Sequence, residues 1–465
     1  MNKFISSLAA ALLLLPSVAS AQFSEATDID DLALIYIGSQ NRPDWTKDKL
    51  RPYVVHTYSD GTESWMFDGF LFMDYMMYDE ETGIIVGLGE DNAEPSRRIH
   101  WERLIDVQFG QADGSGLTAL DELIGELIPV LGEPGHKHKV VFNIPVPHKA
   151  SQIWGSIDGV TMNISFSDDK IKVMKWYADE FLKRWNEAGF KNIELDGVYW
   201  TKESFFEDYW SSVIPETNEY FHSLDLNVYW IPYLNARGWD HWKEWGMDVT
   251  YIQPGYYFET DRPYSRLPEA ANNAWEYGTG LEMEFEGINY GYNTGIKKSY
   301  TYTPENCGLY NNSPEFYQRF VTYIDFFEEE GVFDFMPVAY YNGRQAIYDF
   351  SMSKNPKDRE VIDRLALIMN KRHVESGWDT APRTTGIADV QLADVEIAYP
   401  VAGGIYISDK AAPDVTILRS DGRTVYSSNT VDADSTRLRY GMTVSCSPGV
   451  YIVRSGARSI KVAVR

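Results

Sequence analysis

The chain has 465 residues, of which 44% are hydrophobic, 14% aromatic and 24% charged, so it is long enough for one large and one small domain. Its 68 acidic and 42 basic residues give a net charge of −26, which disfavours nucleic acid and anionic membranes as partners. The chain has only two cysteines, Cys307 and Cys446, and this excludes a framework of disulfides.

The first 21 residues have the pattern of a secretory signal peptide. Basic Lys3 precedes an apolar run from Leu8 to Leu15, and Ala19-Ser20-Ala21 stands before Gln22 as a cleavage site. No cysteine follows that site to carry a lipid, and no later stretch approaches the apolar length that a membrane span needs. We therefore expect a secreted, periplasmic or cell-surface protein without membrane insertion.

Residues 22–380 alternate short apolar runs with helical periodicity, which is typical of repeated strand–helix units. Helices are predicted from Leu117 to Leu131, from Ile171 to Trp185 before Gly189, and from Pro314 to Gly331. Strands are predicted at Leu32 to Gly38, Gly69 to Met73, Lys139 to Pro145, Ile193 to Trp200, Leu226 to Leu234, Val249 to Tyr257, Leu281 to Glu286 and Phe335 to Tyr341. These eight strands with intervening helices predict an α/β fold, a (β/α)8 TIM barrel.

A separate small domain is predicted after the barrel. Residues 381–389 are expected to form a linker, and helical periodicity is absent from residues 390–465. Short β-type runs follow at Gly404 to Ser408, Val415 to Arg419, Thr424 to Ser427, Val450 to Arg454 and Ile460 to Val464. These runs predict a small all-β sandwich.

Several segments of the predicted barrel resemble the domain-of-unknown-function 4855 family of secreted bacterial proteins. The segments are Ile35-Tyr36-Ile37-Gly38, Asp68-Gly69-Phe70-Leu71-Phe72, Tyr229-Trp230-Ile231-Pro232-Tyr233, Gln253-Pro254-Gly255-Tyr256-Tyr257-Phe258, Leu281-Glu282-Met283-Glu284 and Ala339-Tyr340-Tyr341-Asn342-Gly343. The resemblance covers about Asp31 to Lys371 and implies a barrel of the glycoside hydrolase grouping, although the family name defines no activity.

The carboxyl-terminal residues resemble the sorting modules of type IX secretion cargo. The resemblance rests on residues 415–423, 449–454 and 461–464. It implies the secretion machinery as a partner, and the alternative is a β-sandwich without a sorting role.

The predicted seventh strand places Glu282, Glu284 and Glu286 on one face, because side chains alternate along a strand. Buried ionised groups are costly without partners, so this face is expected to line a polar cavity. Cleavage of a glycosidic bond uses two carboxylates. We predict Glu284 as the nucleophile or base, and Glu282 as a buried neighbour that raises its pKa.

The second carboxylate is predicted near the end of the fourth strand. Glu203, in the loop beyond it, is the first choice for the general acid/base, and the alternative is a surface Glu that caps the next helix. Asp196 is the substitute, and Glu194 lies deeper. The resemblance matches the family's strand-four pattern at Gly197, Tyr199, Trp200 and Glu203. The layout is similar to the largest clan of retaining hydrolases, but the Asn-Glu pair of that clan is absent, which leaves retention open.

Aromatic and amide side chains at the predicted strand ends form the expected sugar-binding rim. Aromatic faces cover the apolar faces of sugar rings, and Asn and Gln bond to hydroxyls. The predicted substrate-binding residues are Trp200, Trp230, Tyr233, Asn235, Gln253, Tyr256, Tyr257, Tyr340, Tyr341 and Asn342. Each alone also fits the core, and their common place at one rim favours a cleft. Clustered carboxylates also suit Ca²⁺ or Mg²⁺, but no cofactor or metal is predicted, because no loop has metal-ligand spacing.

These patterns predict a secreted carbohydrate-active enzyme, a glycoside hydrolase that acts on an oligo- or polysaccharide through two carboxylates. The alternative is a barrel at the cell surface or in the periplasm that binds glycan without cleaving it. A third interpretation, a structural or adhesive surface protein, gives no reason for the Glu282 and Glu284 face.

Overall fold

The computed structural model describes most of the chain between residues 27 and 464. The described residues are 27–38, 42–79, 81–89, 93–110, 114–148, 152–205, 210–287, 308–310, 313–379, 398–401, 404–407, 415–419, 423–427, 442–447, 449–455 and 458–464. The predicted signal peptide, the predicted linker and Cys307 lie outside them.

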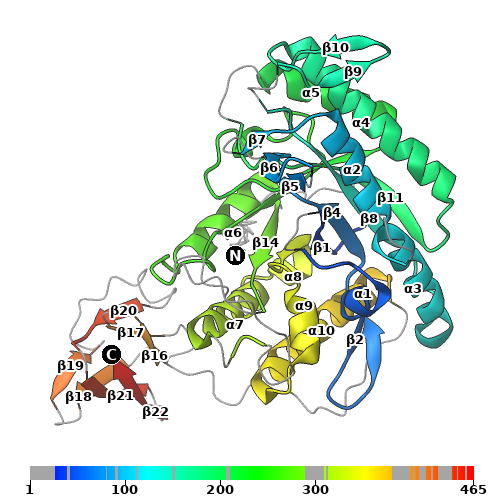
Figure 1. The fold of residues 1–465 in the computed structure, drawn as a ribbon. Helices are drawn as coiled ribbons and strands as arrows, with labels where there is room; N and C mark the ends of the chain where they lie inside the picture. Colours follow the sequence, from blue (N-terminus) through cyan, green and yellow to red (C-terminus); the bar gives the residue numbers. More distant parts are fainter. Residues whose placement is uncertain are drawn as a thin grey trace, which may run out of the picture.

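Eight parallel strands form a closed barrel, so the predicted TIM barrel is confirmed (Figure 1). In chain order they are β1 (Asp31–Tyr36), β4 (Gly69–Met73), β8 (His138–Ile144), β11 (Ile193–Trp200), β12 (Asn227–Trp230), β13 (Val249–Ile252), β14 (Gly280–Glu284) and β15 (Val338–Tyr341). Neighbours in the chain are neighbours in the barrel, and β15 closes it against β1.

Helices surround the barrel. They are α1 (Lys47–Val54), α2 (Arg98–Phe109), α3 (Gly116–Leu131), α4 (Ser167–Ala188), α5 (Trp210–Ser223), η1 (Trp239–His241), α6 (Arg266–Tyr277), α7 (Pro314–Glu329), α8 (Val332–Phe335), α9 (Ala346–Met352) and α10 (Pro356–Ser376). The end of α4 follows the prediction, because Gly189 adopts the left-handed conformation there with φ 60°. Phe335, predicted to begin the eighth strand, instead ends the short helix α8.

Small sheets decorate the loops of the barrel. The pairs β2 (Val55–Thr57) with β3 (Glu63–Trp65) and β9 (Gly155–Ile157) with β10 (Val160–Met162) are hairpins. The long connection between β4 and β8 contains a three-stranded sheet of β5 (Met76–Asp79), β6 (Ile84–Gly87) and β7 (Glu94–Pro95). We call this sheet, together with α2, the β5–β7 insert.

Side chains inside the barrel form one buried cluster, separate from the larger cluster in which outward side chains meet the helices. The inner cluster includes Leu34, Tyr36, Leu71, Met73, Val141, Tyr199, Tyr229, Tyr251 and Ala339. The alternation of inward and outward side chains is interrupted within β11, where the pairing with β8 shifts between Leu195 and Gly197. A Cβ on Gly197 would lie 2.2 Å from the Asn227 carbonyl oxygen, so only glycine fits there.

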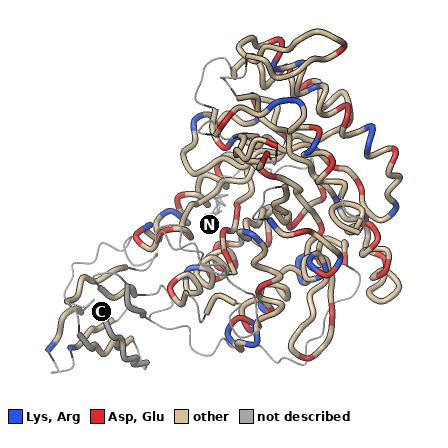
Figure 2. The backbone as a smooth tube through the Cα atoms, in the orientation of Figure 1, with Lys and Arg blue, Asp and Glu red and all other residues tan. Residues whose placement is uncertain are grey.

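The carboxyl-terminal strands form two antiparallel sheets, which Figure 1 draws as one group. One sheet contains β16 (Ala398–Val401), β17 (Gly404–Ile407) and β20 (Met442–Ser445), and the other β18 (Val415–Arg419), β19 (Thr424–Ser427), β21 (Gly449–Ser455) and β22 (Arg458–Val464). Residues of both sheets share one buried cluster, as the predicted sandwich requires. Acidic and basic residues are interspersed along the chain (Figure 2).

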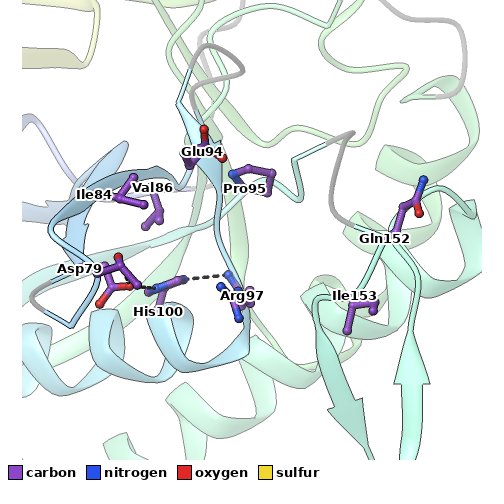
Figure 3. A pocket seen from close by; sticks show the side chains of 10 residues that line it. Asp79, Ile84, Val86, Glu94, Pro95, Arg97, His100, Gln152 and Ile153 are labelled. Carbon is purple, nitrogen blue, oxygen red and sulfur yellow. Dashed lines mark hydrogen bonds and ion pairs between the residues drawn. The ribbon is translucent and has the colours of Figure 1, made fainter.

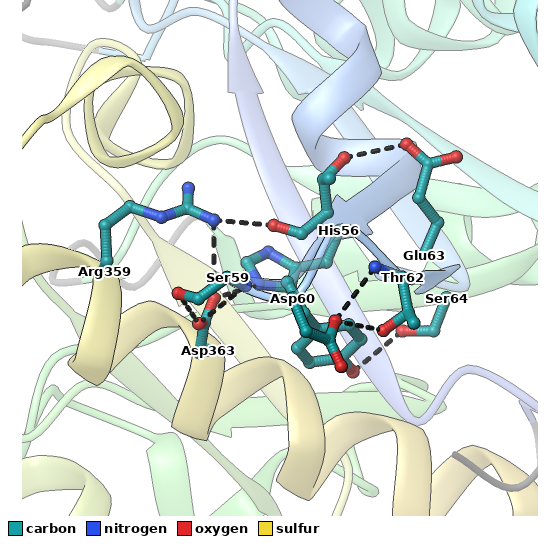
Figure 4. A network of polar contacts seen from close by, with 10 residues as sticks. His56, Ser59, Asp60, Thr62, Glu63, Ser64, Arg359 and Asp363 are labelled. Atoms are coloured by element: carbon teal, nitrogen blue, oxygen red, sulfur yellow. Dashed lines mark hydrogen bonds and ion pairs between the residues drawn. The ribbon is translucent and has the colours of Figure 1, made fainter. Parts of the chain in front are cut away.

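A buried polar network joins the β2–β3 hairpin to α10 (Figure 4). The Asp363 carboxylate lies 2.7 Å from His56 Nε2, accepts the Ser59 hydroxyl at 2.5 Å and its backbone N–H at 3.1 Å, and lies 3.5 Å from Arg359. His56 and Asp363 are both buried. One carboxylate therefore connects two elements that are distant in sequence.

Asp363→Ala is expected to lower the free energy of unfolding by about 3 kcal/mol, because it leaves the buried His56 without its partner and removes the acceptor of Ser59 and Arg359. Urea unfolding followed by Trp fluorescence measures the change. The control Asp60→Ala alters an exposed carboxylate that bonds only to Thr62 in the same turn, and no measurable change is expected. Equal stability of the two variants would contradict this account of the network.

Candidate functional site

The carboxyl ends of the eight strands, with the first residues after them, form the end of the barrel that we call the mouth. Active sites of TIM barrels lie at this end. Glu282 and Glu284 lie on β14, and Glu286 follows two residues after its last residue. All three side chains are buried. The mouth therefore holds three carboxylates from one strand and its extension.

Glu282 faces the barrel interior among tyrosines and other carboxylates. Burial, then the charges of Glu284 and Glu203, raise its pKa well above the usual range. The Glu282 carboxylate also acts electrostatically on Tyr36 and Tyr199, which lie in the inner cluster. Within the described part of the chain, no cation or hydrogen-bond donor pairs with Glu282. The protonated form of this carboxyl group is consequently favoured, and that form can donate a proton.

Glu284 is held from the outside of the barrel. Its Oε2 accepts the Tyr323 hydroxyl of α7 and the Tyr256 N–H at 3.2 Å. Burial raises the pKa of Glu284 to about 7, while the bonds from Tyr323 and Tyr256 oppose that rise. Only 1% of the residue is exposed. This carboxylate is fixed in position by a helix and a loop.

A second group of charges lies beside the first. Arg42 places its guanidinium carbon 4.4 Å from the centre of the Tyr36 ring, and its Nε lies 3.5 Å from Asp74 Oδ2 after β4. Burial raises the pKa of Glu286 to about 7 and that of Asp74 to about 6, and the charge of Arg42 opposes both rises. Asp349 of α9 adds a buried carboxylate near Glu286.

Glu203 lies in the loop after β11 and is exposed. Its charge acts on Glu282 and Tyr199, so it lies over the same part of the mouth as these side chains. Strands β12 and β13 lie between β11 and β14 in the barrel. The structure thus brings Glu203 and Glu282 together from two sides of the mouth, as two of the predicted carboxylates.

Asp196 does not lie with Glu203 and Glu282 at the mouth. It lies at the shift in β11, where its carboxylate accepts the Tyr229 hydroxyl and, at 3.1 Å, the Asn227 amide. Lys139 lies 4.0 Å away, and Thr27, which precedes β1, also bonds to it. These neighbours lie toward the amino-terminal end of the barrel. The sequence-based role of Asp196 as a substitute acid is therefore corrected to a structural one.

Three of the predicted sugar-binding residues point away from the barrel interior. Trp200 and Trp230 are buried among the helices, and their indole N–H groups donate to Asn218 Oδ1 and to the Lys202 carbonyl, each at 2.8 Å. Tyr340 donates to Asp31 Oδ1 at 2.6 Å. The prediction of these three as ligands of a sugar is corrected, because the inward residues of the same strands are Tyr199, Tyr229 and Tyr341.

The remaining predicted binders divide into buried and accessible ones. Tyr256, Tyr257 and Asn342 are buried, and Asn342 bonds to Tyr53 and to the Leu34 carbonyl. The more accessible residues are Tyr233, Asn235, Gln253 and Tyr341. Tyr341 lies at the mouth, with its ring 5.6 Å from that of Tyr36.

Four residues at the mouth were missed by sequence reasoning: Tyr36, Arg42, Asp74 and Tyr199. Tyr36 could have been found, because alternation from Leu32 and Leu34 turns it inward. Tyr199 could not have been found, since the shift in β11 changes which side chains point inward after Leu195. Arg42 stands in a loop, where no periodicity indicates its direction.

Among the described residues, one group of three has ligand atoms close enough to hold a metal ion. The atoms of Asp30, Asp68 and His373 lie within 4.8 Å of one another. Asp68 already accepts the N–H groups of Asp30 and Asp31 at 2.7 and 2.8 Å, and Arg372 Nη2 lies 3.5 Å from Asp30 Oδ1. We therefore assign this group to an ionic cluster at the amino-terminal end, away from the mouth.

The buried carboxylates predict that the protein loses stability as the pH rises. The pKa values of Glu286 and Asp349 rise on folding from 4.5 and 3.8 to about 7. A raised carboxyl pKa contributes stability below the unfolded pKa, and this contribution is lost as the pH rises through about 7. Glu286→Gln is expected to reduce this loss by about 2 kcal/mol.

Urea unfolding at pH 5 and pH 8 measures this effect, with Glu81→Gln as the control because Glu81 is exposed. A wild-type protein that is equally stable at both pH values, or more stable at pH 8, would contradict the assignment.

The comparison with protein families assigns the chain to one family. The family model described as "Domain of unknown function (DUF4855)" matches residues 31–367. A search of the curated proteins found no match. Among the described residues, no helix has the length and apolar character needed to cross a membrane.

Solved structures with a similar chain path include a GH113 β-1,4-mannanase, at 13% identity and TM-score 0.36, covering 73% of this chain and 98% of that one. A GH18 chitinase from Flavobacterium johnsoniae has 10% identity and TM-score 0.34, covering 76% and 96%. A mutant tryptophan synthase α-subunit from Pyrococcus furiosus has 8% identity and TM-score 0.31, covering 74% and 98%. At these values the likenesses carry no argument about activity.

Proposed function

The chain belongs to the DUF4855 family, which is defined without an activity, and from its barrel and mouth we propose that it is a secreted glycoside hydrolase. The observation that carries the proposal is Glu282, a buried carboxyl group in the barrel mouth on which the charges of Glu284 and Glu203 both act. Burial of such a group without a cation costs stability, and hydrolysis by two carboxylates gives a reason for it.

In the proposed reaction Glu282 is the general acid. Its raised pKa keeps it protonated, and it transfers the proton to the glycosidic oxygen as the bond to the sugar carbon breaks. Glu203, exposed on the other side of the mouth, either bonds to the sugar carbon to give a glycosyl-enzyme that water then hydrolyses, or takes the proton of a water whose oxygen bonds to that carbon. Glu284, tied to Tyr323 and Tyr256, is a positioning residue whose charge helps to keep Glu282 protonated.

The side chains around Glu282 support a sugar as the ligand. Tyr36, Tyr199 and Tyr341 line the mouth, and their rings and hydroxyls offer apolar faces and hydrogen-bonding groups together. The carboxylates favour an uncharged glycan over an acidic one, because a second anion would be repelled. The substrate proposed is therefore a neutral oligo- or polysaccharide.

Secretion is part of the proposal and is supported by the first 21 residues, which have the composition of a signal peptide. The carboxyl-terminal sheets are proposed as a separate domain, beginning near residue 390 after a linker, with recognition by secretion machinery as its role. Both parts of this proposal concern residues outside the barrel.

A glycan screen tests the proposal. The mature protein is incubated with xylan, glucomannan, pectin, chitosan and soluble starch, and both binding and new reducing ends are followed. Release of reducing ends by the wild-type protein is expected for at least one of the neutral glycans, which are xylan, glucomannan and soluble starch, and not for the charged pectin and chitosan. Binding without release would support the alternative, a capture protein that holds glycan at the cell surface or in the periplasm.

A further inference from the structure

A cavity of about 270 Å³ lies in the β5–β7 insert, outside the barrel mouth (Figure 3). It is lined by Asp79, Thr82, Ile84, Val86, Glu94, Pro95, Arg97, His100, Gln152 and Ile153. We propose that this cavity binds a single sugar unit of the glycan whose scissile bond lies at the mouth. The inference rests on the proposed function and extends it to a second site of contact with the same chain of sugars.

Two separate segments form the walls of the cavity. The insert supplies one wall, and the loop before β9, with Gln152 and Ile153, supplies the other (Figure 3). The Arg98 N–H at the start of α2 donates to the Trp154 carbonyl at 2.9 Å, which joins the two walls. A Cβ on Gly155 would lie 2.7 Å from Arg98 Cβ, so a glycine permits this close approach. The walls are therefore held at a fixed separation.

The polar base of the cavity is ordered by its own hydrogen bonds. His100 Nδ1 accepts the Arg97 N–H at 2.9 Å, and His100 Nε2 lies 3.5 Å from Asp79 Oδ2. Asp79 also accepts the Thr82 hydroxyl at 2.6 Å. Because Nδ1 is an acceptor, the proton of the neutral ring is on Nε2 and points toward Asp79. This base presents fixed donors and acceptors, while the exposed Glu94 and Gln152 can turn toward a ligand.

Apolar side chains flank these polar groups on both walls. Ile84 of β6 is 44% exposed and Ile153 of the opposite wall is 71% exposed, although both are large aliphatic residues. Val86 and Pro95 add apolar surface on the side of the insert. A mixture of apolar walls and a few polar groups suits a sugar ring, which has apolar faces and polar edges. The small volume favours one ring over several.

The insert is attached to the mouth side of the barrel. The Leu88 N–H donates to the Tyr75 carbonyl at 2.8 Å, and the Val146 N–H donates to the Leu88 carbonyl at 2.6 Å. Tyr75 and Val146 follow the ends of β4 and β8. A Cβ on Gly89 would lie 2.6 Å from the Thr201 side chain, which follows β11. The insert thus lies over the ends of three strands at the mouth, next to the proposed place of hydrolysis.

The test compares the double variant Glu94→Ala/Gln152→Ala with the wild type and with Glu81→Ala, an exposed acid of the same insert that does not line the cavity. Binding to the five polysaccharides of the screen is measured by retardation in native gels. Hydrolysis is measured on the polysaccharide and on an aryl glycoside of the same sugar. The double variant is expected to weaken polysaccharide binding and raise the KM for polysaccharide about 3- to 10-fold, with the kcat for the aryl glycoside unchanged.

Polysaccharide binding and KM equal to those of the wild type would overturn the inference, as would the absence of binding by the wild type to every polysaccharide. Retardation that is lost in the double variant, with no release of reducing ends by the wild type, would support the cavity while rejecting the hydrolase. Release that is unaffected by the double variant would reject the cavity while supporting the hydrolase.

Discussion

Glu282→Gln is expected to lower the rate of glycan hydrolysis by about 10²- to 10⁴-fold while leaving glycan binding and the barrel intact. Glutamine keeps the shape of the side chain and cannot give a proton to the leaving oxygen. Burial and the charges of Glu284 and Glu203 raise the pKa of Glu282, which favours the protonated acid that the proposed reaction needs. Removal of that proton removes the acid from the reaction.

A comparison of two substrates shows whether Glu282 acts as the acid or as the nucleophile. A dinitrophenyl glycoside has a leaving group that needs no proton, so Glu282→Gln is expected to keep most of its activity on it. Glu203→Gln is expected to lose activity on both substrates. If Glu203→Gln instead keeps its activity on the dinitrophenyl glycoside and Glu282→Gln loses it, Glu203 is the acid and Glu282 acts on the sugar carbon. Asp196→Asn is the control, because that carboxylate lies inside the barrel but away from the mouth.

Asp31→Ala is expected to lower the free energy of unfolding by about 3–5 kcal/mol. Asp31 is fully buried, its Oδ1 lies 3.1 Å from Arg372 Nη1, and its Oδ2 lies 2.8 Å from His373 Nε2. Tyr340 also donates to Oδ1 at 2.6 Å. The variant leaves the buried side chains of Arg372 and His373 on α10 without their carboxylate partner on β1.

Urea unfolding measures this loss, with Asp28→Ala as an exposed control in the segment before β1. Although burial opposes it, the charges of Arg372 and His373 hold the pKa of Asp31 below its ordinary value of 3.8. A lowered carboxyl pKa contributes stability above the unfolded value, which is lost as the pH falls below about 4. The wild type should therefore lose more stability than Asp31→Ala on acidification from pH 5 to pH 3, and an equal loss would contradict the assignment.

The barrel was predictable from sequence because each of its strands is a short apolar run followed by a helix or a long loop. The predicted ends were less accurate, since apolar residues continue past the last paired residue. Val249 to Tyr257 was predicted as a strand, but the strand ends at Ile252 with one isolated bridge at Gln253, and Tyr256 and Tyr257 turn away to pack against α7. Tertiary contacts of this kind produce no periodic pattern of apolar residues in the sequence.

The site was predictable where alternation held and failed where it was interrupted. Glu282 and Glu284 lie on the predicted strand and at the predicted end of the barrel. Trp200 was misplaced by the shift in β11, which turns Gly197 and Tyr199 inward, whereas Asp196 faces the barrel interior as predicted but lies too far from the mouth. The polar contacts of Arg42 with Asp74 join a loop to a strand end, so no local pattern could show them.

The most direct test of the central claim is the yield of new reducing ends from a glycan that the protein binds, measured in parallel for the wild type, Glu282→Gln and Asp196→Asn. Hydrolysis at the mouth predicts release by the wild type and by Asp196→Asn, and at least 100-fold less release by Glu282→Gln. Binding by all three proteins with no release by any, or equal release by wild type and Glu282→Gln, would contradict it.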